Sequence, residues 1–177
     1  MGNRAVITTS TLHDVQNSND IGVYLHWNGG RDSVEGFLKY CELKGYPSPE
    51  KDNYGWARLC QVIGNFFGGV YSIGIDRCQR LDCDNCDNGT YIIKDWQIVD
   101  RKYFVGIEQQ EYDLTDVLLS INEAQPVDEQ LSKDIIFRET HKEACDMNDK
   151  QMRMWNFMCT LSGEEVARLF LNYHGCL

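Results

Sequence analysis

Three cysteines that lie close together in the sequence could bind a metal ion. Cys83 and Cys86 form a C-x2-C pair, and Cys78 lies five residues before Cys83. A C-x2-C turn can supply two thiolates to a tetrahedral zinc ion, which needs four ligands in a structural site. The chain contains no second C-x2-C or H-x3-H pair, and flanking aspartates disfavour thiolate formation. We therefore expect a loop with incidental thiols here, with zinc as the alternative, and no cofactor.

A second candidate site lies in the segment His26–Ser33, for which the residue types predict a strand end, a glycine-rich turn and a helix start. Backbone N–H groups at such a turn can hold an anion. The segment matches neither G-x-G-x-x-G nor G-x4-G-K-[ST], so a connecting turn whose glycines adopt positive φ is the alternative. The candidate ligand-binding residues are His26, Asn28, Gly29, Gly30, Arg31 and Ser33.

Catalytic motifs are missing from the sequence. It contains no G-x-S-x-G, no H-E-x-x-H and no zinc-deaminase signature, and its four histidines are scattered. No general base can be placed beside a nucleophile by spacing alone. We therefore predict a binding protein rather than an enzyme.

The charge is unevenly distributed. The 177 residues carry 17 Lys and Arg against 27 Asp and Glu, which gives a net charge of −10. Residues 76–150 hold nine basic and eighteen acidic side chains, and so account for nearly all of the excess. An acidic surface repels nucleic-acid phosphates and attracts a basic partner. Direct binding to nucleic acid is left open, because a local basic patch is compatible with this net charge.

The acidic middle of the chain also suggests contact residues for a basic partner. Acidic side chains alone do not give a buried anchor, which aromatic residues supply in many interfaces. We therefore add a tryptophan to the aspartates of this segment. The candidate partner-binding residues are Asp82, Asp84, Asp87, Asp95, Trp96 and Asp100.

The elements that must position these residues follow from apolar periodicity. Strands are predicted at Val6–Thr9, Gly22–Trp27, Val70–Ile75, Thr90–Lys94, Gln97–Val99 and Tyr103–Ile107. Helices are predicted after Asp32 or Ser33, over Tyr54–Phe67 and after Asp113 or Thr115, with further helices beyond Pro126. Strands that meet in hairpins, with grouped helices, indicate an α+β fold with a mostly antiparallel sheet.

The pattern changes at Pro126, beyond which only helical periodicity remains. We therefore predict a core domain over residues 1–125 and a helical extension over residues 126–177. The extension either packs on the core or forms an interaction arm. We expect proteolysis near its start and a folded chain after truncation at Gln125.

Three stretches of the sequence resemble a family of small proteins carried by phages, plasmids and conjugative elements of gut Firmicutes. They are the opening MGNRAVI, the segment Gly22–Glu35 and the segment Tyr54–Ile63. The resemblance covers roughly residues 1–125. The group is loosely associated with anti-CRISPR proteins that inhibit type II effector nucleases. The resemblance transfers no catalytic residues.

The resemblance implies a host-defence antagonist that binds a CRISPR effector nuclease with its guide RNA stoichiometrically. Such nucleases hold nucleic acid in positively charged channels, which an acidic protein complements. The alternative is a small-molecule or nucleotide-binding protein, or an enzyme, that uses the Asn28–Ser33 turn. No apolar run approaches the ~20 residues of a transmembrane helix, and the N-terminus lacks a signal-peptide pattern. We therefore expect a location in the bacterial cytoplasm and no membrane partner.

Overall fold

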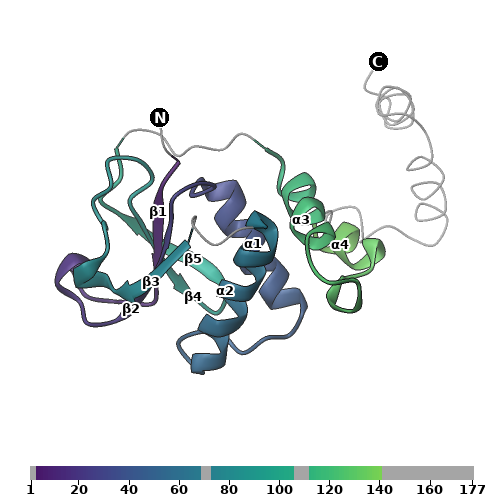
Figure 1. Ribbon diagram of the computed structural model, residues 1–177, viewed down its shortest axis with the longest axis horizontal. Coiled ribbons are helices and arrows are strands. Elements are labelled where there is room, and N and C mark those ends of the chain that lie inside the picture. Colours follow the sequence, from purple (N-terminus) through teal and green to yellow (C-terminus); the bar gives the residue numbers. More distant parts are fainter. Residues whose placement is uncertain (1–2, 69–72, 106–111, 141–177) are drawn as a thin grey trace, which may run out of the picture. The chain divides into compact units, whose positions relative to one another are not determined.

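A five-stranded sheet forms one side of the fold (Figure 1). The computed structural model describes residues 3–68, 73–105 and 112–140. The strands run in the order β3-β2-β1-β4-β5 across the sheet. Their bounds are Ala5–Thr8 for β1, Ile21–Leu25 for β2, Ile73–Arg77 for β3, Thr90–Lys94 for β4 and Gln97–Lys102 for β5. Pairing is antiparallel except between β1 and β4, which are parallel. The predicted α+β class with a mostly antiparallel sheet is confirmed.

Helices form where the sequence places an amphipathic pattern behind a cap. Their bounds are Arg31–Leu43 for α1, Asn53–Phe67 for α2, Leu114–Glu123 for α3 and Lys133–Thr140 for α4. Asp52 and Asp113 cap α2 and α3, since each side chain accepts a bond from the backbone N–H two residues on. The N-cap of α1 is Gly30, so the prediction that Asp32 or Ser33 starts this helix was wrong.

Strand alternation divides the apolar residues between two clusters. The main core joins one face of the sheet, including Ala5 and Ile7, to helices α1, α2 and α3. The second cluster lies on the opposite face and contains Val6, Val15, Cys78, Cys83 and Ile92. Loops carry its non-strand members, among them the short helices η1 (Val15–Asn17) and η2 (Cys78–Arg80).

Several strand predictions differ from the structure. The strand predicted over 70–75 is observed over Ile73–Arg77, and its predicted start lies partly outside the described residues. Tyr103 lies beyond the end of β5 and has a positive φ of 55°, so no strand begins there. Residues 106 and 107 of that prediction lie outside the described residues. The parallel β1–β4 pair was not anticipated, because nothing local marks a pairing between residues so distant in the sequence.

The end of the first compact unit lies later than Pro126. The chain divides into one unit over Met1–Ile136 and a second over Phe137–Leu177. Ile136 of α4 is fully buried in the main core, and Leu131 packs against the same core. The short helix η3 (Val127–Glu129) and the start of α4 therefore belong to the first unit. Residues 141–177 of the extension predicted over 126–177 lie outside the described residues.

Candidate functional site

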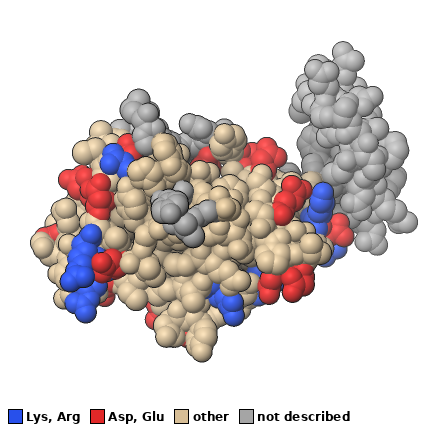
Figure 2. Space-filling model, viewed as in Figure 1, with Lys and Arg blue, Asp and Glu red and all other residues tan. Residues whose placement is uncertain are grey.

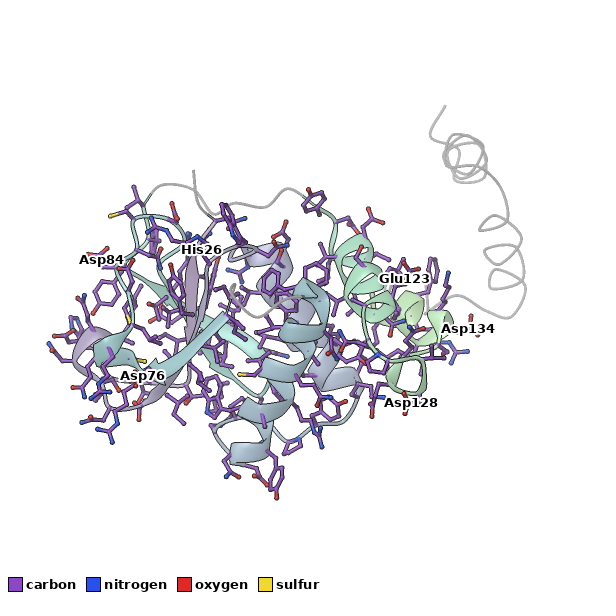
Figure 3. All side chains as sticks on the ribbon, viewed as in Figure 1. His26, Asp76, Asp84, Glu123, Asp128 and Asp134 are labelled. Atoms are coloured by element: carbon purple, nitrogen blue, oxygen red, sulfur yellow. The ribbon has the colours of Figure 1, made fainter. Side chains whose placement is uncertain are left out.

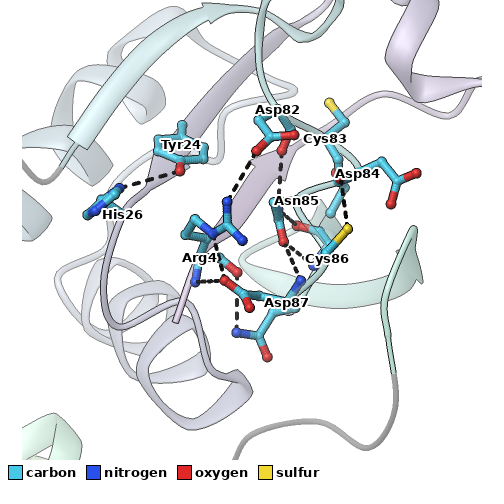
Figure 4. A network of polar contacts seen from close by, with 12 residues as sticks. Arg4, Tyr24, His26, Asp82, Cys83, Asp84, Asn85, Cys86 and Asp87 are labelled. Atoms are coloured by element: carbon cyan, nitrogen blue, oxygen red, sulfur yellow. Dashed lines mark hydrogen bonds and ion pairs between the residues drawn. The ribbon is translucent and has the colours of Figure 1, made fainter. Parts of the chain in front are cut away.

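The loop that contains three of the predicted contact aspartates is fixed to the start of β1. Parallel pairing places Val6 opposite Thr90, and this brings Arg4 beside the 82–89 loop (Figure 4). The Arg4 Nε donates to Asp87 Oδ2 at 2.6 Å, and Nη1 lies 3.6 Å from Asp82 Oδ2. The hydrogen bond to Asp87 raises the pKa of Arg4. Arg4 therefore neutralises part of the charge that the sequence assigned to this loop.

The three aspartates of the loop differ in what they can contact. The Asp87 side chain is 8% exposed, so it is a structural partner of Arg4 and not a surface contact. Asp84 and Asp82 are both exposed, and the Asp82 side chain, 53% exposed, also forms an ion pair with Arg4 at 3.6 Å. Asn85 shapes the loop, because its side-chain oxygen accepts from the N–H groups of Asp87 and Gly89. Of the three, Asp82 and Asp84 are exposed, as a contact residue must be, and Asp87 is not.

The β4–β5 turn contributes two exposed aspartates and one core residue. Asp95 forms an ion pair with Lys51, and the pair holds the pKa of Asp95 below its usual range. Asp100 is exposed on β5. Trp96 is 6% exposed, lies in the main core and donates its indole N–H to the Tyr46 carbonyl at 2.9 Å. Trp96 is therefore a packing residue, and the prediction of a surface anchor there was wrong.

The Asn28–Ser33 turn uses its backbone groups for internal contacts. The Gly29 N–H donates to the Asn3 carbonyl at 2.8 Å. The Asp32 carboxylate accepts the N–H of Ser33 at 2.6 Å and of Tyr112 at 3.0 Å. A side-chain anion thus already occupies the N-terminus of α1. This arrangement gives no support to an anion-binding role for the turn.

The remaining predicted ligand residues of this segment do not converge on one point. Arg31 forms an ion pair with Glu35 one turn along α1. Ser33 and Gly30 are buried, whereas His26 is exposed and lies edge-on to Trp27 at a ring distance of 5.0 Å. The positive φ of this turn belongs to Asn28, at 53°, and not to a glycine. Gly29 is required instead by close approach, since a Cβ there would lie 2.6 Å from the Ala5 nitrogen.

The three loop cysteines do not gather around one point. Cys78 and Cys83 are fully buried in the second cluster, and Cys86 is exposed with its sulfur 3.9 Å from the Asp84 carbonyl. Among the described residues, no group of three or more His, Cys, Asp or Glu side chains is placed to hold a metal ion. The arrangement therefore favours the interpretation of this segment as a structural loop.

Among the described residues, a marked local excess of acidic side chains lies in α3, η3 and the start of α4. Residues 112–136 contain six Asp and Glu but a single basic residue, Lys133. Glu123, Asp128 and Asp134 are exposed and lie along the same end of the first unit (Figure 3). We call these three residues the acidic surface. On the face shown in Figure 2, charged side chains lie mainly around the edge and the middle is largely uncharged.

Two buried amides hold the segment that carries the acidic surface. Asn122 is 4% exposed, and its side chain exchanges two hydrogen bonds with the Leu131 backbone, at 3.1 and 2.7 Å. Gln125 is 5% exposed and donates to the carbonyls of Val62 and Ile121 at 3.2 and 2.9 Å. Asn65 of α2 donates to the Gln125 oxygen at 2.9 Å. Because buried amides need all of these partners, the chain between α3 and α4 is fixed in one conformation.

Glu129 binds the segment between α3 and α4 to the end of α1 by an ion pair and hydrogen bonds. The Lys44 ammonium lies 2.9 Å from Glu129 Oε2 and donates to the Glu129 carbonyl at 2.8 Å. The hydroxyls of Tyr40 and Tyr46 donate to its carbonyl and its carboxylate, at 2.6 and 3.1 Å. The hydrogen bond from Lys44, with that from Tyr46, lowers the pKa of Glu129. Burial and this bond raise the pKa of Tyr46 to about 12.

Two apolar side chains project beside the acids. Val127 of η3 is 87% exposed and Ile135 of α4 is 42% exposed. An exposed apolar residue among charges can become the desolvated centre of an interface. Sequence reasoning missed this site because the charge was counted over residues 76–150 as one window. A count over residues 112–136 alone would have identified it.

No family model, curated protein or solved structure matches the chain. Within the part of the chain that the structure describes, none of the helices has both the length and the apolar character needed to cross a bilayer.

Proposed function

We propose that this protein is a binding protein that inhibits a nucleic-acid-handling enzyme by covering its basic surface. The observation that supports this proposal is the acidic surface, in which Glu123, Asp128 and Asp134 stand exposed beside Val127. Opposite charges steer two proteins together and set their orientation. The exposed valine would supply the apolar contact that charge alone does not give.

The partner to test first is a type II CRISPR effector nuclease loaded with its guide RNA. The resemblance of residues 1–125 to mobile-element proteins associated with anti-CRISPR activity suggests it. These nucleases hold the guide–target heteroduplex in a positively charged channel. The protein would act in the bacterial cytoplasm, where such a nuclease operates. It would act in stoichiometric amounts and without catalysis.

A charge-matched pair of variants tests the role of the acidic surface. The first variant combines Glu123→Gln, Asp128→Asn and Asp134→Asn. The second combines Asp84→Asn, Asp95→Asn and Asp100→Asn, which removes the same charge from exposed positions elsewhere. We expect the first variant to associate about 10-fold more slowly at low salt and the second to change little, because rim charges act mainly on association.

The measurement is the association rate with the guide-loaded nuclease at low and at high salt, about 50 and 500 mM, with cleavage inhibition read in parallel. At high salt the parent should associate with the nuclease no faster than the first variant does, since salt screens exposed charges. If both variants associate equally slowly, the association rate depends on net charge and not on the acidic surface. If the parent protein does not bind the guide-loaded nuclease at any molar ratio, this nuclease is excluded as the partner.

A titration distinguishes stoichiometric binding from catalysis. Inhibition should be complete at a molar ratio of about one and should not progress with time below that ratio. Continued loss of nuclease activity at substoichiometric protein would show turnover and contradict the proposal.

A further inference from the structure

Cys78 and Cys83 form a close pair on the face of the sheet that the helices do not cover. Both are 0% exposed and share the second cluster with Val6, Val15 and Ile92. The Cys83 thiol donates to the Cys78 carbonyl oxygen at 3.5 Å, and the Cys78 thiol donates to the Thr8 hydroxyl oxygen at 3.3 Å. The Cys83 sulfur therefore contacts the Cys78 backbone, and both side chains lie in the same small buried cluster.

The backbone brings the pair together by a tight turn. The Leu81 N–H donates to the Cys78 carbonyl at 3.0 Å, and the Cys83 N–H donates to the Leu81 carbonyl at 2.9 Å. This folds the chain back so that both side chains enter the same apolar cluster. Cys86 has a positive φ of 56° and is exposed, so the C-x2-C partner of Cys83 points elsewhere.

We propose that Cys78 and Cys83 are an oxidisable dithiol that closes an intramolecular disulfide with a peroxide as oxidant. One thiolate attacks the peroxide oxygen, which gives a sulfenic acid and releases water. The second thiol then attacks this sulfur, the S–S bond forms and a second water leaves. The two thiols lose two electrons and two protons, and hydrogen peroxide is reduced to two waters.

The environment of the pair favours reaction at Cys78. The nearby Cys83 side chain lowers the pKa of Cys78, as does the Thr8 hydroxyl 3.3 Å from the Cys78 sulfur, whereas the nearby Cys78 side chain and burial raise the pKa of Cys83. A thiolate is the species that attacks an oxidant. Cys78 is thus the attacking sulfur and Cys83 the resolving one.

Access to the pair comes through local opening. The second cluster is small and is covered by loop segments, and such regions open at lower free energy than the main core. Cys41, by contrast, is a residue of α1 that is buried in the main core, and burial raises its pKa. Cys41 therefore serves as an internal control for a buried thiol that does not react.

Tryptic mapping tests which sulfurs pair. Cleavage after Arg77, Arg80 and Lys94 places Cys78 on peptide 78–80, and Cys83 with Cys86 on peptide 81–94. The folded full-length protein is treated with hydrogen peroxide, blocked with an alkylating reagent and digested without reductant. We expect a linked species of 78–80 and 81–94 that a reducing agent separates. A free Cys78 with a Cys83–Cys86 bridge inside 81–94, or a link from Cys78 to any other cysteine, would overturn the proposal.

Two single variants sharpen the assignment. Cys86→Ser should keep the linked species at the parent's yield, because Cys86 is exposed and takes no part. Cys83→Ser should abolish it and leave Cys78 as the sulfenic acid, detectable by a dimedone-type probe. Loss of the linked species in Cys86→Ser, with a parent-like circular dichroism spectrum, would mean that Cys86 is a member of the pair.

Discussion

At the scale of single residues, close backbone approach at the end of the sheet decides which side chain is allowed. A Cβ at Gly29 would lie 2.6 Å from both the Ala5 nitrogen and the Arg4 carbonyl carbon. Gly29 also donates to Asn3, so the turn cannot move away without breaking this bond. A Cβ at Gly64, within α2, would meet no atom of another element within 4 Å.

We therefore predict opposite effects of the same substitution at these two glycines. Gly29→Ala should lower the free energy of unfolding by about 2–3 kcal/mol, because atoms that cannot shift would overlap. Gly64→Ala should raise it by about 0.5–1 kcal/mol, because alanine is the better helix former. Urea unfolding followed by circular dichroism measures both. A neutral Gly29→Ala would show that β1 and the turn are not held together as described.

At the scale of elements, the start of α4 belongs to the first unit through one buried side chain. Ile136 is fully buried in the main core, whereas its neighbour Ile135 is 42% exposed. Ile136→Ala should cost about 2–4 kcal/mol of stability, because it leaves a cavity in the core. Ile135→Ala should change stability by less than about 0.5 kcal/mol. Thermal or urea unfolding measures both variants. An equal loss of stability in the two would mean that α4 does not turn Ile136 alone toward the core.

The attachment of η3 to α1 should depend on pH. The pKa of Glu129 is lowered in the folded protein, so its pairing with Lys44 contributes stability above the pKa of an unfolded glutamate. That contribution is lost as pH falls below about 4.5 and through the lower folded value. We predict that Glu129→Gln is less stable than the parent at neutral pH and that the difference shrinks below about pH 4.5. A difference independent of pH would exclude the carboxylate as its cause.

At the scale of the whole molecule, the division at Ile136 predicts which truncations fold. A chain that ends at Thr140 should keep a cooperative unfolding transition, because it retains the first unit. A chain that ends at Gln125 should lose much of its stability, since it lacks Ile136, the Glu129 contacts and the Leu131 partner of Asn122. This revises the expectation from the sequence. Differential scanning calorimetry of both chains makes the comparison, and a cooperative transition in the shorter chain would restore the boundary at Pro126.

Local patterns in the sequence were sufficient for most of the elements and for the fold class. Apolar periodicity and caps are local properties, so α2 and α3 and the Asp113 cap of α3 could be predicted. Short strands predicted to meet in hairpins indicated a mostly antiparallel sheet, because a tight turn is also a local property. The excess of acid after residue 75 could also be predicted, because charge is a property of composition.

The availability of those residues to a partner depends on tertiary contacts. The parallel pairing of β1 with β4 brings Arg4 within hydrogen-bond distance of Asp87. Packing in the main core buries Trp96. Buried amides and Glu129 hold η3 so that Glu123, Asp128 and Val127 stand exposed. A tight turn, and not the C-x2-C spacing, places Cys78 and Cys83 in the second cluster. These outcomes depend on contacts between residues far apart in the chain or on which face a turn presents, and no local pattern records either.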